Sequence, residues 1–183
     1  MKTVCTFLLV LFGSSVAFAQ PAPYPGYFQL PINQETKKVE YTAIVPVAGA
    51  DSEELFARAT GWLTQLGSAH TVTHRVSNPE TGTLVTHVRA GNKFDAKAFR
   101  LAIQVKDGQY HYVVDQITHA QSDYARAGKY SVGTVTTNIE AYGLRRQRKN
   151  LIKTIDQIDN LILTTISDLN STMAGSAQPN TLI

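Results

Sequence analysis

The residues of this sequence best suited to hold a metal ion are its five histidines, which are His70, His74, His87, His111 and His119. His70 and His74 stand in a stretch that we interpret as a strand, where four residues span about 13 Å. Two imidazoles must both lie about 2.1 Å from one zinc ion, so neighbouring strands would have to supply such a pair. In the expected register, His74 and His87 lie on opposite faces of the sheet. The pattern therefore predicts no metal and no cofactor.

Motifs for nucleophilic catalysis are not found in the sequence. The only cysteine, Cys5, lies in an N-terminal segment that is expected to be removed, so the rest of the chain has no thiol and no disulfide. Glu53 and Glu54 stand where they would complement a helix N-terminus, and Asp156 and Asp159 stand on the expected solvent face of another helix. With no G-x-S-x-G, G-x-G-x-x-G or P-loop, neither a serine nucleophile nor a nucleotide site is indicated.

A ligand site is best supported around the stretch 120–137, which we interpret as a long connection. Connections of this length are usually functional or mobile, although Lys129–Thr136 could form a short edge strand. The residues there that offer an imidazole, two phenols and a guanidinium are His119, Tyr124, Arg126 and Tyr130. We take these four as the candidate ligand residues.

One dense basic run, residues 144–149 (LRRQRK), could contact a phosphate group. Such runs are more often a solvated face of a helix. The net charge of the chain is +3, which is too small to indicate a polyanionic partner. The sequence therefore predicts no nucleic-acid partner.

The first twenty residues have the three parts of a secretory signal peptide. Lys2 supplies the positive charge, residues 4–12 form a short apolar run, and Ala17 and Ala19 are the small residues before an expected cleavage between Ala19 and Gln20. The run is far shorter than the ~20 residues of a membrane span, and no second stretch approaches that length. We expect an exported protein, periplasmic or secreted, without a transmembrane segment.

Composition divides the rest of the chain into three parts. Prolines are dense up to Pro31, which favours extended backbone, so we assign residues 20–36 to a proline-rich linker or arm. Residues 37–173 form one domain, and residues 174–183 are expected to be a flexible tail. The oligomeric state that we expect is a monomer or a homodimer.

Periodicity predicts the elements of this domain. The stretch 38–47 alternates as a half-buried strand does. Asp51 with Glu54 begins a helix, and Gly67 stands at its expected C-terminal cap. Strands 70–77 and 83–90 follow, and their expected apolar pairs are Val72 with Val88 and Val76 with Leu84.

A second hairpin has a stronger signal, because Asp107-Gly108 between two alternating runs is typical of a type I′ turn. A two-residue loop sets the register, which pairs Ile103 with Tyr112, Leu101 with Val114 and Arg100 with Asp115. The last element is a long helix with apolar residues at steps of three and four, namely Leu151, Ile155, Ile158, Ile162, Ile166, Leu169 and Met173. The expected fold is α+β, with a β-α-β4-α order and both helices on one face of an antiparallel sheet.

Three segments of the chain resemble the family called domain of unknown function 4468. They are LPINQETKKVEYTAIVPVAGADSEELFARATGWL, LAIQVKDGQYHYVVDQITH and LIKTIDQIDNLI, and the resemblance spans about residues 30–173. The resemblance implies an exported bacterial protein with a single TATA-binding-protein-like (TBP-like) unit and a curved sheet. The family has no established activity and no catalytic residues, so it implies no chemistry.

These observations favour a non-enzymatic binding or interaction module whose partner is an unknown protein or small ligand. One alternative is a small hydrolase that uses residues of the sheet and of the stretch 120–137. A cleft that gathers two or more of His111, Asp115, His119 and Tyr130 would favour it. A second alternative is a lipid or small-molecule carrier with a groove between the sheet and the last helix.

Overall fold

The computed structural model describes residues 30–128, 131–143 and 149–175, and within these ranges the side chains of residues 74–75, 124–128 and 131–132 are outside the description. The elements, in chain order, are β1 (Tyr41–Pro46), α1 (Ser52–Ala69), β2 (Thr71–Asn78), β3 (Thr83–Gly91), β4 (Asp95–Lys106), β5 (Gln109–Gly128), β6 (Ser131–Asn138), α2 (Glu140–Gly143) and α3 (Lys149–Met173).

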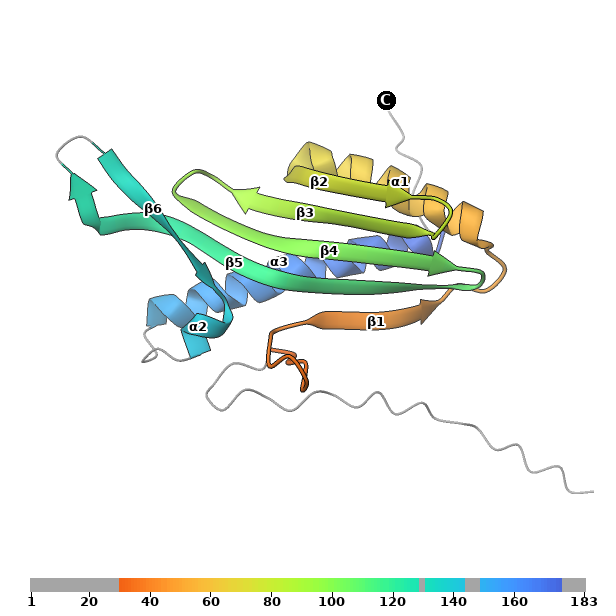
Figure 1. Cartoon of the computed structure of the whole chain (residues 1–183), viewed down its shortest axis with the longest axis horizontal. Coiled ribbons are helices and arrows are strands. Elements are labelled where there is room, and N and C mark those ends of the chain that lie inside the picture. Colours follow the sequence, from red (N-terminus) through yellow and green to blue (C-terminus); the bar gives the residue numbers. More distant parts are fainter. Residues whose placement is uncertain (1–29, 129–130, 144–148, 176–183) are drawn as a thin grey trace, which may run out of the picture.

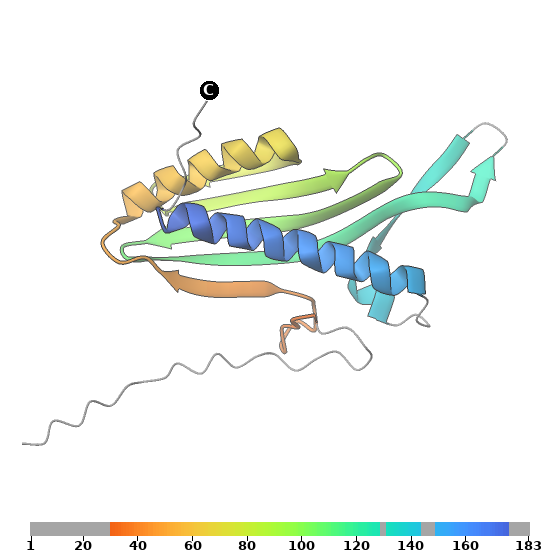
Figure 2. The ribbon, with the colours of Figure 1, turned by 180° about the vertical axis from the view of Figure 1, so that it is seen from behind.

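The strands form one antiparallel, curved sheet in the order β1-β5-β4-β3-β2, and β6 pairs with the second half of β5. Helices α1 and α3 lie side by side on one face of this sheet, and none of the described helices lies on the opposite face (Figures 1 and 2). This arrangement confirms the predicted α+β fold with both helices on one face. In the described parts of the chain, no helix is long and apolar enough to cross a membrane.

We predicted that the stretch 120–137 is a long connection, but in the structure it forms most of a β-hairpin. Strand β5 continues to Gly128, and β6 returns along it in an antiparallel pairing that includes Ala120 opposite Thr136. The predicted edge strand Lys129–Thr136 is therefore confirmed from Ser131 on as part of β6, and residues 129–130 lie outside the described residues. The sequence did not indicate the second half of β5. This hairpin extends past the helices (Figure 1) and so lacks the apolar alternation of a strand that covers a core.

The register of the β4–β5 hairpin is as predicted, including Ile103 opposite Tyr112 and Arg100 opposite Asp115. The β2–β3 register agrees with the prediction only in part. Val72 lies opposite Val88, but a bulge after Thr73 shifts the chain, and Val76 then pairs with Val85 instead of Leu84. As a result, the side chain of Val76 is 57% exposed.

The predicted start of α1 is confirmed and its predicted end is wrong. The side chain of the N-cap, Asp51, accepts a hydrogen bond of 2.8 Å from the amide of Glu54. The helix passes through Gly67 to Ala69 and ends on His70, whose backbone is extended. Gly67 therefore makes no left-handed cap.

The apolar stripe of α3 packs on the sheet, as predicted. Ile158, Ile162 and Leu169 have no exposed surface, and they belong to the same buried cluster as Leu101, Ile103 and Val114. Buried side chains of both the helix and the sheet thus meet in this interface.

Our prediction was wrong for one residue of α3. Asp159 was expected on the solvent face, but its carboxylate accepts a hydrogen bond of 2.6 Å from the hydroxyl of Tyr41 in β1. Two other polar residues of α3 are bonded in the same way, Asp168 to the indole of Trp62 at 2.8 Å and Asn170 to the hydroxyl of Tyr110 at 2.6 Å. These bonds fix the helix on its apolar stripe.

The folded unit begins before residue 37. Leu30 and Ile32 are buried, Ile32 forms a bridge with Val39, and the amide of Glu40 donates to the carbonyl of Pro31 at 3.0 Å. Residues 30–33 of the segment that we assigned to the linker therefore pack against the start of β1.

Candidate functional site

A bulge in β5 decides which polar residues meet. Gln116 has a φ of 52°, and the β4–β5 register shifts between Ala98 and Arg100. Val114 and Ile117 are both buried, although a regular strand would place residues three apart on opposite faces. The extra residue therefore turns the second half of β5 over, and His119 comes to the helix-covered face while His111 stays on the open face.

His119 is the centre of a buried hydrogen-bonded chain. Its side chain is only 5% exposed, its Nδ1 lies 2.7 Å from the hydroxyl of Tyr142 in α2, and its Nε2 lies 2.8 Å from Oδ1 of Asp95. The ammonium group of Lys97 in turn donates to both oxygens of Asp95, at 2.9 and 3.0 Å. We call Tyr142, His119, Asp95 and Lys97 the His119 chain.

The His119 chain joins parts of the fold and leaves no ring nitrogen of His119 for a ligand. Partial burial by itself raises the pKa of Asp95, but the hydrogen bonds from Lys97 and His119 and the positive charge of Lys97 outweigh it and hold that pKa below its ordinary value. The carboxylate is thus charged at neutral pH and orients the imidazole. Through Tyr142, the same chain fixes α2 against the sheet.

The other predicted residues are not brought together. His111 lies 2.8 Å from the hydroxyl of Thr42, whereas Asp115 forms a two-pronged ion pair with Arg100. Neither shares a hydrogen bond with His119, so these three residues do not form the cleft that the hydrolase alternative requires. Within the described ranges, no group of three histidines, cysteines or carboxylates could hold a metal ion.

The remaining candidates cannot be placed in a site. Tyr124 and Arg126 lie in the backbone of β5, but their side chains are outside the described residues, and so is the whole of Tyr130. Most of the basic run, residues 144–148, is also outside them.

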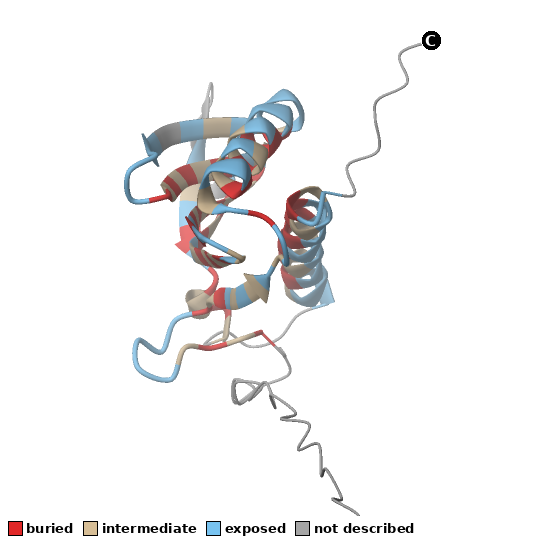
Figure 3. Cartoon of the chain, turned by 90° about the vertical axis from the view of Figure 1, so that its right-hand side faces the viewer, coloured by how far each residue is buried: buried red, intermediate tan, exposed pale blue. Residues whose placement is uncertain are grey.

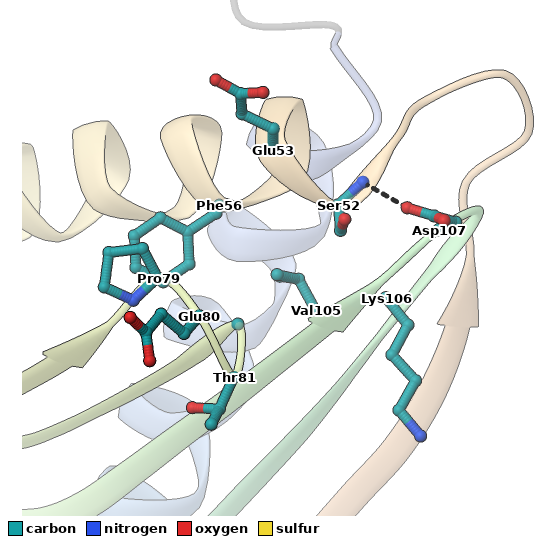
Figure 4. Close-up of a pocket in the computed structure, with 10 residues that line it drawn as sticks. Ser52, Glu53, Phe56, Pro79, Glu80, Thr81, Val105, Lys106 and Asp107 are labelled. Atoms are coloured by element: carbon teal, nitrogen blue, oxygen red, sulfur yellow. Dashed lines mark hydrogen bonds between the residues drawn. The ribbon is translucent and has the colours of Figure 1, made fainter.

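A pocket lies at the other end of the sheet, where the first turn of α1 meets two hairpin turns (Figure 4). Its volume is about 650 Å³. The apolar part of its lining consists of Phe56, Pro79 and Val105. The acidic part consists of Glu53, Glu80 and Asp107. Lys106 and the polar residues Ser52 and Thr81 complete the rim, and Figure 4 shows the side chain of Lys106 directed away from α1.

Tight local structure shapes this pocket. The β2–β3 turn is held by Asn78, whose side-chain oxygen accepts from the amide of Glu80 at 3.0 Å. Gly82 has a φ of 63°, and a β-carbon on it would lie 2.6 Å from the carbonyl oxygen of Val105. Only glycine therefore allows the turn to lie this close to β4.

The β4–β5 turn is attached to α1 by Asp107. Its carboxylate accepts from the amide of Ser52 at 2.8 Å (Figure 4), and hydrogen bonds from Ser52 lower its pKa below the ordinary value. The pocket can thus offer negative charge beside an apolar surface, which suits a ligand that has a cationic group and an apolar body. Sequence reasoning found the two turns but missed the pocket, because its residues come from three segments far apart in the chain.

Comparisons with known proteins agree with the architecture. Residues 41–120 match the family model described as domain of unknown function (DUF4468) with TBP-like fold. A TBP-like protein from Parabacteroides distasonis ATCC 8503 is 15% identical, with a TM-score of 0.52 over 77% of this chain and 97% of that one.

A second crystal structure, of a DUF4468 family protein from Bacteroides ovatus ATCC 8483, is 12% identical, with a TM-score of 0.52 over 84% of this chain and 94% of that one. No curated protein matches the chain. At these identities the two structures show the fold alone, and the family match carries no activity. The chain therefore has a TBP-like fold, and its residues 41–120 match the DUF4468 family model.

Proposed function

We propose that this protein is an exported, non-enzymatic binding module whose ligand enters the pocket between α1 and the two hairpin turns. The observation that carries the proposal is the composition of that pocket, in which Phe56 and Val105 provide apolar surface beside Glu80 and Asp107. Binding pockets combine an apolar lining with a few polar groups that orient the ligand.

Charge determines the class of ligand in this proposal. Three carboxylates and one ammonium group line the pocket, so its formal charge is −2 at neutral pH, from three negative charges and one positive charge. The low pKa of Asp107 keeps its carboxylate charged in mildly acidic solution. A small molecule or peptide side chain with an amine and an apolar body would satisfy both parts of the lining.

A matched pair of probes tests this proposal. Phenethylammonium and the uncharged 2-phenylethanol have the same ring, and binding of each is followed by amide chemical shifts in NMR spectra. We expect phenethylammonium alone to shift the amides of residues 52–56 and 79–82 and to bind several-fold more weakly to Glu80→Gln. The control, Glu35→Gln, removes an exposed charge outside the pocket and should change nothing. Shifts spread over the whole surface, or equal for both probes, would refute the proposal.

Export is the second part of the proposal, and it rests on the signal-like sequence of residues 1–19. The mature chain is expected to begin at Gln20. Intact mass measurement on protein from the native periplasm or medium checks this directly. Protein that retains Met1 and stays in the cytosol would contradict export while leaving the pocket proposal to its own test.

A further inference from the structure

The three free edges of this sheet are protected to different degrees. Strand β2 forms one edge, and β1 and β6 lie one after the other along the opposite side, because both pair with β5. A free edge offers unpaired amides and carbonyls to any other strand, and proteins usually block it with proline, charge, a bulge or a covering segment.

Strands β1 and β2 carry such devices. The bulge after Thr73 interrupts β2, and Arg75 adds a charged residue to it. At the start of β1 the outward amide of Glu40 is already bonded to Pro31, and its last residue, Pro46, has no amide hydrogen. Both edges are therefore poor templates for a further strand.

Strand β6 carries fewer of these devices among the described residues, since the one irregularity of its pairing with β5 lies before Gly133. Its sequence, SVGTVTTN, contains no charge and no proline. Its register with β5 is regular from Gly133 to Asn138. The tip of its hairpin extends past α3, its C-terminal end leads into α2, and α1 lies at the other side of the sheet (Figures 1 and 2), so another chain can approach β6 without meeting α1.

The hydrogen bonds around β5 show which groups of β6 point outward. The amide of Ser122 donates to Phe94 on the β4 side, whereas the carbonyl of Ile117 accepts from the amide of Ile139 on the β6 side. Odd-numbered residues of β5 therefore bond to β6, and their partners there are Gly133, Val135 and Thr137. By alternation, the backbone groups of Thr134, Thr136 and Asn138 face outward.

From this geometry we propose that β6 is a strand-addition interface between two copies of this chain. The two β6 strands pair antiparallel about a two-fold axis at Thr136, so that the outward residues of each copy meet those of the other. Thr136 then lies opposite its own counterpart, and Thr134 lies opposite Asn138. All three outward residues find a partner in this register, and the two sheets become continuous.

A second copy suits this edge better than a charged partner does. Antiparallel pairing of two identical strands places identical residues opposite each other near the two-fold axis. Charged residues would repel each other there, but β6 has no charged residue. The side chains of Thr134, Thr136 and Asn138 are exposed, and threonine favours strands. Because short strands bury little surface, the dimer is expected to be weak and concentration-dependent.

Two substitutions at Thr136 test the interface by sedimentation equilibrium of the full chain. Thr136→Lys sets two like charges opposite each other, and Thr136→Pro removes an outward amide without touching the bonds to β5. We expect Thr136→Pro to raise the dimer dissociation constant about tenfold or more, because it removes two intermolecular hydrogen bonds. Thr71→Lys, at the exposed start of the opposite edge strand, is the control and should leave the constant unchanged.

Disulfide trapping tests the register, in a Cys5→Ser background that has no other cysteine. Thr136→Cys should cross-link to itself, because opposite residues lie about 5.5 Å apart. Thr134→Cys should cross-link with Asn138→Cys and not with itself. A chain that stays monomeric up to about 1 mM would overturn the proposal. A dimer that survives both Thr136 variants, or that is trapped equally by Thr71→Cys, would overturn it as well.

Discussion

The two ends of strand β5 belong to regions that are stabilised differently. Its first half lies under the helices, where Val114, Leu101 and Ile158 are each at most 1% exposed. Its second half pairs with β6 in a hairpin that extends past them (Figure 1), and Gln121 and Thr134 there are exposed. The first region is held by buried apolar surface, and the second by backbone pairing and the His119 chain.

This difference indicates how the chain divides its roles. Opening of a segment costs little free energy where few apolar contacts are buried. The hairpin should therefore open more readily than the packed region, which makes it the adaptable part of the molecule. The buried residues show the same division, because they are concentrated where the helices face the sheet (Figure 3).

The largest effect is expected in the packed region. Ile158→Ala removes a side chain with no exposed surface and should lower the free energy of unfolding by about 2–5 kcal/mol. Leu163→Ala changes the same helix at a side chain that is 48% exposed and should cost less than about 1 kcal/mol. Urea unfolding of both variants measures the difference. Equal losses would show that burial does not separate the two positions.

A glycine pair sharpens the comparison at the pocket end of the packed region. Gly82→Ala puts a methyl group 2.6 Å from a backbone oxygen in a left-handed conformation, so we expect a loss of about 2–4 kcal/mol. Gly108 has a φ of 73° and open space around it, so Gly108→Ala should cost only about 1 kcal/mol. Thermal unfolding followed by circular dichroism separates the two costs. A larger loss at Gly108 would contradict the close contact at Gly82.

The junction between the two regions can be weakened selectively. Tyr142→Phe removes the hydroxyl that bonds Nδ1 of buried His119, and leaving a buried polar atom unpaired costs about 1–3 kcal/mol. Hydrogen exchange should then quicken at the amides of β6 and stay unchanged in β3. Thr42→Val removes the exposed partner of His111 and serves as the control. Uniform acceleration across the sheet would show that the two regions open together.

The smallest expected effect is a dependence on alkaline pH. Burial first, and then the neighbouring Tyr112, raise the pKa of Tyr110 to about 12, above its ordinary value of 10.0. The unfolded chain therefore loses this proton first. The stabilising contribution is complete below pH 10 and is lost as the pH rises to about 12. Tyr110→Phe should flatten the fall of the urea midpoint over this range, and an unchanged slope would contradict it.

Local patterns in the sequence were sufficient for the packed region. The apolar steps of α3, the Asp51 cap and the Asp107-Gly108 turn each depend on interactions between residues close in sequence. The register of the second hairpin then followed by counting outward from its turn. Amphipathic periodicity also indicated that α3 covers the sheet, because an apolar stripe must be buried.

Other features of this protein were decided by contacts between distant residues. No glycine or proline signals the bulge at Gln116 in the sequence. The bulge nevertheless exchanges the two faces of the rest of β5 and brings His119 to Tyr142 and Asp95. The pocket needs α1 and two turns to meet, and the bond from Tyr41 to Asp159 spans 118 positions. The sequence by itself determined most elements of the packed region, since local periodicity and turn residues specify them, but not the hairpin of β5 and β6. Only the tertiary structure decided which polar groups meet, because that depends on a one-residue shift in pairing that no local pattern records.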